Sequence, residues 1–200
     1  MKKSSIMDFM DINKLIASRL LALRERRGLS LTALSDRSGV SRSNISLIER
    51  GESSATATVL DKLAGALGVT LASLFEAGQD EPAPPSPLQR AADQPVWTDP
   101  ASGYVRRQLS PAVRTPLQLV EVVFPPGQRV TYEQVVREAD IHQQIWLLDG
   151  VMNVSAGDQQ WRLEAGDCLA IREDQHISYA NPGKTPARYL VGLVTLPFAI

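Results

Sequence analysis

A proline-rich segment between residues 78 and 95 divides this chain into two parts that cannot share one fold class. The segment holds five of the 13 prolines and, apart from Leu88, almost no large apolar residue. It cannot bury a core, so we expect it to run as an extended connector. The chain has 200 residues, enough for two small domains. The connector therefore predicts separate domains over residues 1–77 and 96–200.

The two flanks of the connector differ in hydrophobic period. Before it, apolar residues such as Ile12, Leu15 and Ile16 recur at helical spacing. After it, short segments rich in Val, Ile, Tyr and Trp, such as LQLVEVVF and ARYLVGLVT, are separated by Gly, Pro and Asp, which is typical of an all-β sandwich or barrel. Residues that cap helices predict a five-helix bundle in the first part, with helix starts at Asp11, Ser30, Ser41, Thr56 and Thr70.

Charge and cysteine usage limit where the chain works. Residues 1–78 carry 11 Lys and Arg against 8 Asp and Glu, whereas residues 79–200 carry 10 against 14. This asymmetry favours a polyanionic partner for the first part only, although scatter in surface charge explains it equally well. The nearly apolar stretch 189–200 is too short to span a bilayer, and the lone Cys168 cannot form an internal disulfide. We therefore expect a cytoplasmic protein with no membrane partner.

The stretch LTALSDRSGVSRSNISLIERG, residues 31–51, has the pattern of two short helices joined by a tight turn. Ser35 is small where the helices must cross, and Gly39 lies where the turn needs a positive φ. Four apolar residues are spaced so that both helices share one small core, namely Leu34, Val40, Ile45 and Ile48. The pattern predicts a helix-turn-helix, with a plain bundle that has a solvated polar face as the alternative.

Residues 12–75 resemble the lambda-repressor-like (XRE/Cro) DNA-binding domain, whose pattern is followed almost throughout by GVSRSNISLIERGESSATATVLDKLAGALGVTLASLF. The resemblance implies that residues 41–50 form a recognition helix for double-stranded operator DNA. The residues that it implies as DNA contacts are Arg42, Ser43, Asn44, Ser46, Leu47, Arg50, Leu31 and Thr32.

Two leucines depart from the family pattern. Leu31 stands where the family usually has a polar residue that contacts DNA, and Leu47 stands where some relatives read a base. A leucine can still touch a thymine methyl group. Base readout is therefore expected mainly from Arg42 and its neighbours, while Arg50 lies where the family approaches a phosphate.

Residues 96–200 resemble a cupin, a small β-barrel of jelly-roll type. The stretches that carry the resemblance are FPPGQRV, IHQQIWLLDGVMNVSAGDQQWRLEAGDCLAI and ANPGKTPARYLVGLV. Cupins have two metal-binding motifs, G-x5-H-x-H-x(3,4)-E-x6-G and G-x5-P-x-G-x2-H-x3-N. Laid on these motifs, the chain has other residues at all four ligand positions, namely Glu133, Val135, Gln143 and Ile177.

Two histidines, His142 and His176, lie one residue out of register with these motifs. A slip of one residue turns a strand side chain to the opposite face of the sheet. The histidines could therefore ligate a metal only in a different register, where Glu133 would complete a facial triad. The register as aligned predicts a barrel without a metal or other cofactor.

A barrel of this kind can enclose a cavity for one small molecule. Strand parity points Glu133, Gln143 and Tyr179 into that cavity and leaves His142 and His176 at its rim. A carboxylate and an amide inside a barrel need hydrogen-bond partners, which a ligand could supply. A barrel filled by side chains and used only for dimerisation is the alternative.

Two other residues of the second part invite a chemical interpretation. Cys168 lies in the apolar strand pattern CLAI, and we expect it to be packed rather than nucleophilic. Trp146 could stack on a ligand, but a place in the core or in a dimer interface is the simpler expectation. The sequence presents no catalytic constellation.

The order of the two parts resembles the XRE–cupin regulators. The resemblance implies a transcriptional regulator, not an enzyme, that binds operator DNA as a homodimer. Its cupin domain would bind a small-molecule effector, mediate dimerisation, or both. The alternative is a metal-dependent cupin enzyme with an appended DNA-binding domain, and a bound metal would distinguish the two.

Overall fold

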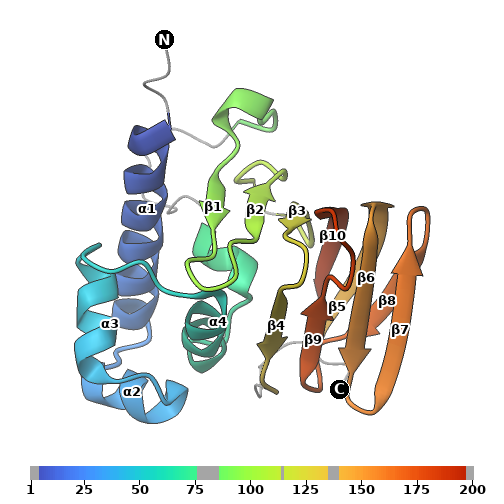
Figure 1. Cartoon of the computed structure of the whole chain (residues 1–200). Coiled ribbons are helices and arrows are strands. Elements are labelled where there is room, and N and C mark those ends of the chain that lie inside the picture. Colours follow the sequence, from blue (N-terminus) through green and yellow to red (C-terminus); the bar gives the residue numbers. More distant parts are fainter. Residues whose placement is uncertain (1–4, 76–85, 114, 135–139, 197–200) are drawn as a thin grey trace.

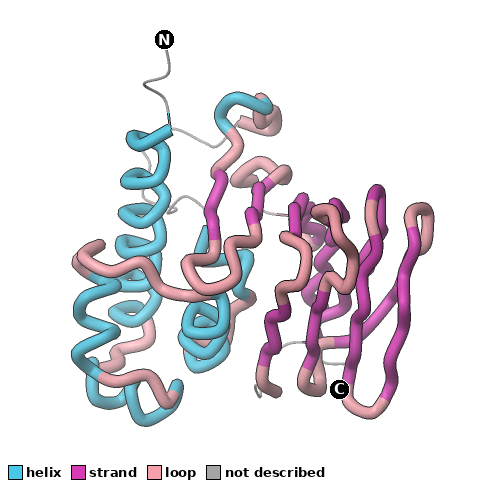
Figure 2. Tube along the Cα trace, in the orientation of Figure 1, coloured by secondary structure: helices cyan, strands magenta, loops and turns pink. Residues whose placement is uncertain are grey.

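The computed structural model of the chain describes residues 5–75, 86–113, 115–134 and 140–196. Helices fill the first of these ranges and strands dominate the others, as the change in hydrophobic period predicts (Figures 1 and 2). A helical part followed by an antiparallel β part is therefore confirmed. Among the described residues, no helix is long and apolar enough to cross a membrane.

The helical part begins with four α-helices. They are α1 (Ser5–Arg26), α2 (Leu31–Ser38), α3 (Arg42–Glu49) and α4 (Ala57–Ala66). Three predicted N-caps are confirmed, because the side-chain oxygens of Ser30, Ser41 and Thr56 each accept a hydrogen bond from the backbone N–H three residues later. The starts of α2, α3 and α4 are thus fixed by single hydroxyl groups.

Two predictions for the helices are wrong. Helix α1 begins at Ser5, so Asp11 lies inside it rather than at its cap. Neither Gly nor Pro occurs between these residues to stop the helix. The fifth element is a 3-10 helix, η1 (Leu71–Phe75), because Ser73 N–H bonds to the carbonyl oxygen of Thr70 at 3.0 Å, three residues back. The bundle therefore has four α-helices, not five.

Within the described residues, the β part has ten strands in two antiparallel sheets. The six-stranded sheet runs in the order β1-β2-β3-β10-β5-β8 and the four-stranded sheet in the order β4-β9-β6-β7. The strands are β1 (Val96–Thr98), β2 (Val105–Gln108), β3 (Leu117–Phe124), β4 (Arg129–Tyr132), β5 (Asp140–Asp149), β6 (Val151–Ala156), β7 (Gln159–Glu164), β8 (Cys168–Arg172), β9 (Ile177–Ala180) and β10 (Ala187–Leu196). A short 3-10 helix, η2 (Ala91–Asp93), precedes β1 within the predicted connector.

The helices pack directly against the β part. Figure 1 shows β1 and β2 between α1 and β3, and α4 beside β4. Trp97 on β1 makes an edge contact with Phe75 of η1, with ring centroids 5.5 Å apart. The carboxylate of Asp99 accepts a hydrogen bond of 2.9 Å from the backbone N–H of Ala57, at the buried start of α4. One continuous hydrophobic core therefore joins the two parts.

Candidate functional site

The turn between α2 and α3 has the geometry of a helix-turn-helix. Gly39 ends α2 with φ of 69°, and its N–H donates to the carbonyl oxygen of Ser35. A Cβ at residue 39 would meet no atom within 4 Å, so the glycine is needed for its backbone angle and not for space. The four apolar residues predicted to form the shared core are all buried, namely Leu34, Val40, Ile45 and Ile48.

The opposite face of α3 carries the predicted DNA contacts. Arg42, Ser43 and Arg50 are exposed, Asn44 and Ser46 are half-buried, and 37% of Leu47 is exposed. Arg42 Nη1 donates to Thr32 Oγ1 at 3.3 Å, which links the starts of α3 and α2. Leu31 differs from this group because it is half-buried and packs against the core.

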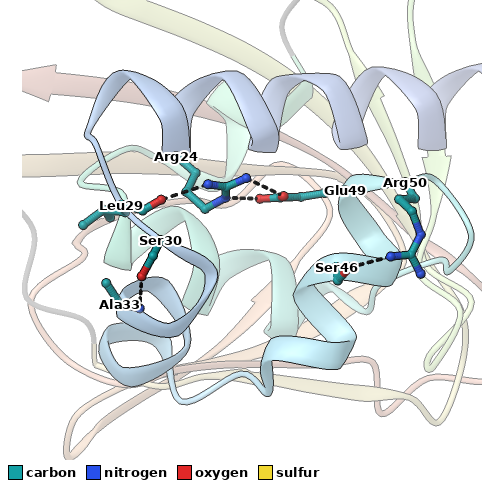
Figure 3. Close-up of polar contacts among 7 residues, drawn as sticks. All are labelled: Arg24, Leu29, Ser30, Ala33, Ser46, Glu49 and Arg50. Atoms are coloured by element: carbon teal, nitrogen blue, oxygen red, sulfur yellow. Dashed lines mark hydrogen bonds and ion pairs between the residues drawn. The ribbon is translucent and has the colours of Figure 1, made fainter.

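A nearly buried ion pair fixes α3 against α1 (Figure 3). Arg24 donates from Nε and Nη2 to the two oxygens of Glu49, at 2.7 and 2.9 Å. Its Nη1 donates to the carbonyl oxygen of Leu29 at 2.8 Å. The hydrogen bonds to Glu49 raise the pKa of Arg24 above its ordinary value. The orientation of α3 is therefore set before any partner binds.

At the C-terminal end of α3, a second arginine uses its Nε and Nη2 atoms to bind a carboxylate. Arg50 donates from Nε and Nη2 to Glu52, both at 2.9 Å, and from Nη1 to Ser46 Oγ. The hydrogen bond from Arg50 lowers the pKa of Glu52. Without DNA, the predicted phosphate contact is thus held by an exposed carboxylate.

A cavity of about 80 Å³ lies between the β strands and the helices. Three of the residues predicted to line a barrel cavity do line it, namely Glu133, Gln143 and Tyr179. The helical part contributes Asp61 of α4 and also Thr70, Leu71 and Ala72, from the start of η1. No sequence pattern predicts this contribution, because a contact between distant parts of the chain leaves no local signal.

Polar side chains of the cavity bond to one another. Tyr179 donates to Gln143 Oε1 at 2.9 Å, and Gln143 Nε2 donates to Glu173 at 3.3 Å. Tyr104 and Tyr132 share a hydrogen bond of 3.0 Å between their hydroxyl groups. Burial raises the pKa of Tyr104 to about 12 and raises that of Tyr179 further. These phenols therefore stay neutral at physiological pH.

Arg106 of β2 also lines the cavity, although it was not among the predicted lining residues. It is 8% exposed, and its guanidinium lies 5.2 Å from the ring centroid of Phe75. Side chains alternate between the two faces of a strand, so one of the adjacent residues Arg106 and Arg107 must point inward. This alternation is the sequence signal that could have identified an inward arginine.

The two histidines expected at the rim lie elsewhere. His142 is exposed on the outer face of β5, 3.3 Å from Asp140. His176 is exposed just before β9, and its carbonyl oxygen accepts from Gly157 N–H. Strand alternation explains the first error, because Gln143 takes the inward position next to His142.

The residues at the cupin ligand positions do not fit a transition metal. Among the described residues, no three His, Cys, Asp or Glu side chains are grouped to hold a metal ion. Glu133 forms an ion pair with Lys62 of α4 at 3.1 Å, and Ile177 is a buried aliphatic side chain. Val135 lies outside the described residues.

Comparison with known proteins agrees with the helical geometry. A family model described as helix-turn-helix matches residues 20–74. The HTH-type transcriptional regulator SutR of Escherichia coli (strain K12) is 34% identical over 195 residues, covering 90% of this chain and 94% of the relative. The chain belongs to the HTH-type transcriptional regulators.

Two further similarities support this assignment. An uncharacterized HTH-type transcriptional regulator, y4dJ of Sinorhizobium fredii (strain NBRC 101917 / NGR234), is 37% identical over 73 residues, covering 36% of this chain and 95% of the relative. The crystal structure of an HTH_3 family transcriptional regulator from Vibrio cholerae superposes with a TM-score of 0.73 at 26% identity, covering 94% of this chain and 99% of that one. The likeness to this structure extends over both parts of the regulator.

The regulator also has an apolar hollow on the outer face of its six-stranded sheet. Trp146 is 49% exposed there, and the leucines 117 and 119 beside it are 43% and 40% exposed. Cys168, expected to be packed, is exposed in the same hollow, because it pairs with Trp146 across β5 and β8 and shares its outward direction. The apolar CLAI segment thus contributes to the outer face of the six-stranded sheet, which the described part of a single chain leaves exposed.

Proposed function

We propose that this transcriptional regulator reads a specific operator sequence in double-stranded DNA through α3. The observation that carries the proposal is the fixed, polar outer face of α3, held from behind by Arg24 and Glu49. A recognition helix must present hydrogen-bonding side chains to base edges at a defined angle.

The side chains divide into two roles. Arg42, Ser43 and Asn44, at the start of α3, are proposed to contact base edges, and Ser46 and Leu47 to extend that surface. Arg50 is proposed to contact a phosphate, with Thr32 holding Arg42 in place and Leu31 contacting DNA at the start of α2.

The test compares two arginine variants on a specific and a random duplex, with the specific duplex selected from a random library. Arg42→Ala should weaken binding by about 1–3 kcal/mol on the selected duplex and relax specificity at one base pair. Arg50→Ala should weaken binding to both duplexes alike. Arg162→Ala, at an exposed arginine of β7, is the control. Equal losses on both duplexes for Arg42→Ala would contradict the base-reading role.

We further propose that the regulator acts as a homodimer through the apolar hollow around Trp146. Two-fold dimers place recognition helices about 34 Å apart, so that they meet successive major grooves. Exposed apolar patches rimmed by polar residues mark such interfaces. Trp146→Glu should give a monomer in sedimentation at tens of micromolar, whereas Trp161→Glu on the four-stranded sheet should not. A wild-type monomer would exclude this proposal.

The proposed domain organisation is a DNA-binding domain over residues 1–77, a connector over 78–95 and a cupin domain over 96–200. The cupin domain is proposed to bind a small-molecule effector in the cavity lined by Glu133, Gln143 and Tyr179, without a metal and without catalysis. The donor set at the ligand positions supports this, because oxygen ligands alone suit iron and zinc poorly. Elemental analysis of untagged protein should find no stoichiometric transition metal. One iron or zinc per chain, with an activity lost on chelation, would favour the enzyme alternative.

A further inference from the structure

We infer that the cavity between the helices and the barrel takes a small carboxylate, which is bound by Arg106. The inference rests on the effector cavity of the proposed function and specifies its chemistry. It begins from a buried cationic side chain, because Arg106 is 8% exposed.

The hydrogen-bonding groups of Arg106 are incompletely used. Among the described residues, neither Nε nor Nη2 of Arg106 has a hydrogen-bond partner, although both atoms are inaccessible to water. Two neighbouring side chains share this condition, at Trp97 Nε1 and Gln108 Oε1. Trp97 pairs with Arg106 across β1 and β2, and Gln108 lies two residues further along the same face of β2. Buried polar atoms without partners are rare in folded proteins, and their clustering beside a cavity points to a missing partner.

Two other arginines of the chain show which partner binds the edge formed by Nε and Nη2. Arg24 and Arg50 each use Nε and Nη2 to bind both oxygens of one carboxylate, at 2.7 to 2.9 Å. The same two atoms are the ones without partners in Arg106. The planar fork matches a carboxylate in geometry as well as in charge.

The surroundings of Arg106 restrict the size and shape of the ligand. The ring of Phe75 lies 5.2 Å from the guanidinium carbon, so one face of the fork is covered. A cavity of about 80 Å³ is small beside the roughly 300–1,000 Å³ of pockets that hold drug-sized ligands. We therefore expect a carboxylate of few carbon atoms, whose other end meets the hydroxyl and amide groups of Tyr179 and Gln143.

The position of the cavity gives its ligand access to both parts of the regulator. Asp61 and Thr70 come from the helical part, whereas Arg106 and Tyr104 come from the β part. Phe75, which stacks on Arg106, belongs to the helical part as well. A carboxylate on Arg106 therefore contacts a joint between the two parts and not the inside of an isolated barrel.

The test measures thermal unfolding and calorimetric binding of the full chain with a set of probes. The probes are C2–C5 monocarboxylates, with and without an α-amino or α-hydroxy group, each compared with its amide at matched ionic strength. At least one carboxylate should raise the Tm and give saturable binding, and its amide should bind at least tenfold more weakly. Inorganic phosphate and sulfate, which a guanidinium fork can also bind, should raise the Tm less than the best carboxylate does.

Two variants assign the effect to Arg106. Arg106→Met should abolish carboxylate binding, and Arg106→Lys, which keeps the charge but lacks the fork, should weaken it about tenfold. Arg107→Met is the matched control, because Arg107 is the next residue of β2 and points outward to Glu121. If Arg106→Met fails to fold, Arg106→Lys against Arg107→Met still decides the question.

Several results would overturn the inference. They are equal binding of carboxylates and amides, binding of phosphate or sulfate alone, no binding by any carboxylate, and undiminished binding by Arg106→Lys and Arg106→Met. Binding of the ligand-free protein to its selected duplex is measured in parallel. If the duplex binds and the carboxylates do not, only the inference fails. If the carboxylates bind and no duplex is bound specifically, the DNA-reading proposal fails instead.

Discussion

The outer side of the helices and the cavity beneath them use arginine in opposite ways. Around α3, the Nε and Nη2 atoms of Arg24 and Arg50 are paired with glutamates of the same chain. In the cavity, the same atoms of Arg106 have no partner among the described residues. The first region is complete without a ligand, so its role is to present a fixed surface. The second region is incomplete, and this is the observation on which the proposed carboxylate site rests.

The largest effect should come from breaking the contact between the helical part and the β part. Asp99 is 2% exposed and accepts hydrogen bonds from Ala57 N–H and from both the N–H and the hydroxyl of Ser102. Asp99→Ala leaves these buried donors unpaired, so the free energy of unfolding should fall by about 3 kcal/mol. Urea denaturation of the full chain measures this, with the exposed Asp93→Ala as control. A loss as small as that of the control would show that the contact does not hold the two parts together.

A smaller loss of stability is expected when the ion pair between Arg24 and Glu49 is broken. Glu49→Ala removes the carboxylate that binds Arg24 and fixes α3. The free energy of unfolding should fall by about 2 kcal/mol, because the lost hydrogen bonds involve charged groups. Operator binding should weaken as well, since α3 is no longer held at one angle. Glu25→Ala, on the exposed side of α1, is the control; unchanged affinity for Glu49→Ala would mean that the ion pair does not orient α3.

Replacing the arginine of the cavity should change the free energy of unfolding in the opposite direction. Arg106→Met removes a buried charge whose Nε and Nη2 have no partner in the described part of the chain, and it keeps a side chain of similar length. Without ligand, the free energy of unfolding should stay unchanged or rise by about 1 kcal/mol, as is found when buried charges are replaced by apolar residues. Denaturation in buffer free of carboxylates measures it. A loss of about 2 kcal/mol or more would assign Arg106 to stability and remove the contrast.

The smallest effect concerns the exposed pair beside α3. Glu52→Gln keeps the shape of the side chain but releases Arg50 from a carboxylate. Affinity for any duplex should rise about two- to fivefold, and the slope of log affinity against log salt should steepen by up to about 0.9, the value for one further phosphate contact. The exposed Glu164→Gln on β7 is the control. No change in the salt slope would show that Arg50 does not reach a phosphate.

The helix-turn-helix could be predicted from the sequence because its determinants are local. Ser30, Ser41 and Thr56 cap helices through bonds that span three residues, and Gly39 adopts its positive φ within a single turn. The start of α1 was less predictable, since Asp11 is a good cap residue in a stretch where nothing forces the helix to begin. Residue preferences mark where a helix can start, and only packing decides where it does.

The cavity was only partly predictable. Strand parity correctly placed Gln143 and Tyr179 inward. The same parity turns His142 outward, so the prediction that His142 lies at the cavity rim was inconsistent with it. The contributions of Asp61 and Thr70 depend on how the helices pack on the barrel, which no local pattern encodes. Arg106 was overlooked because an arginine in a strand is usually exposed.

A cavity lined by both parts of the regulator gives the proposed ligand contacts through which it could influence DNA binding. If a carboxylate changes the affinity for the operator by some factor, the operator must change the affinity for that carboxylate by the same factor. This reciprocity allows the DNA to be used as a reagent. A saturating operator fragment, added to a titration of the cavity, would reveal the sign and size of the coupling without any measurement of transcription. A cavity closed within the β part alone would have offered no such direct route, because Asp61, Thr70 and Phe75 would then have no contact with the site or with its arginine.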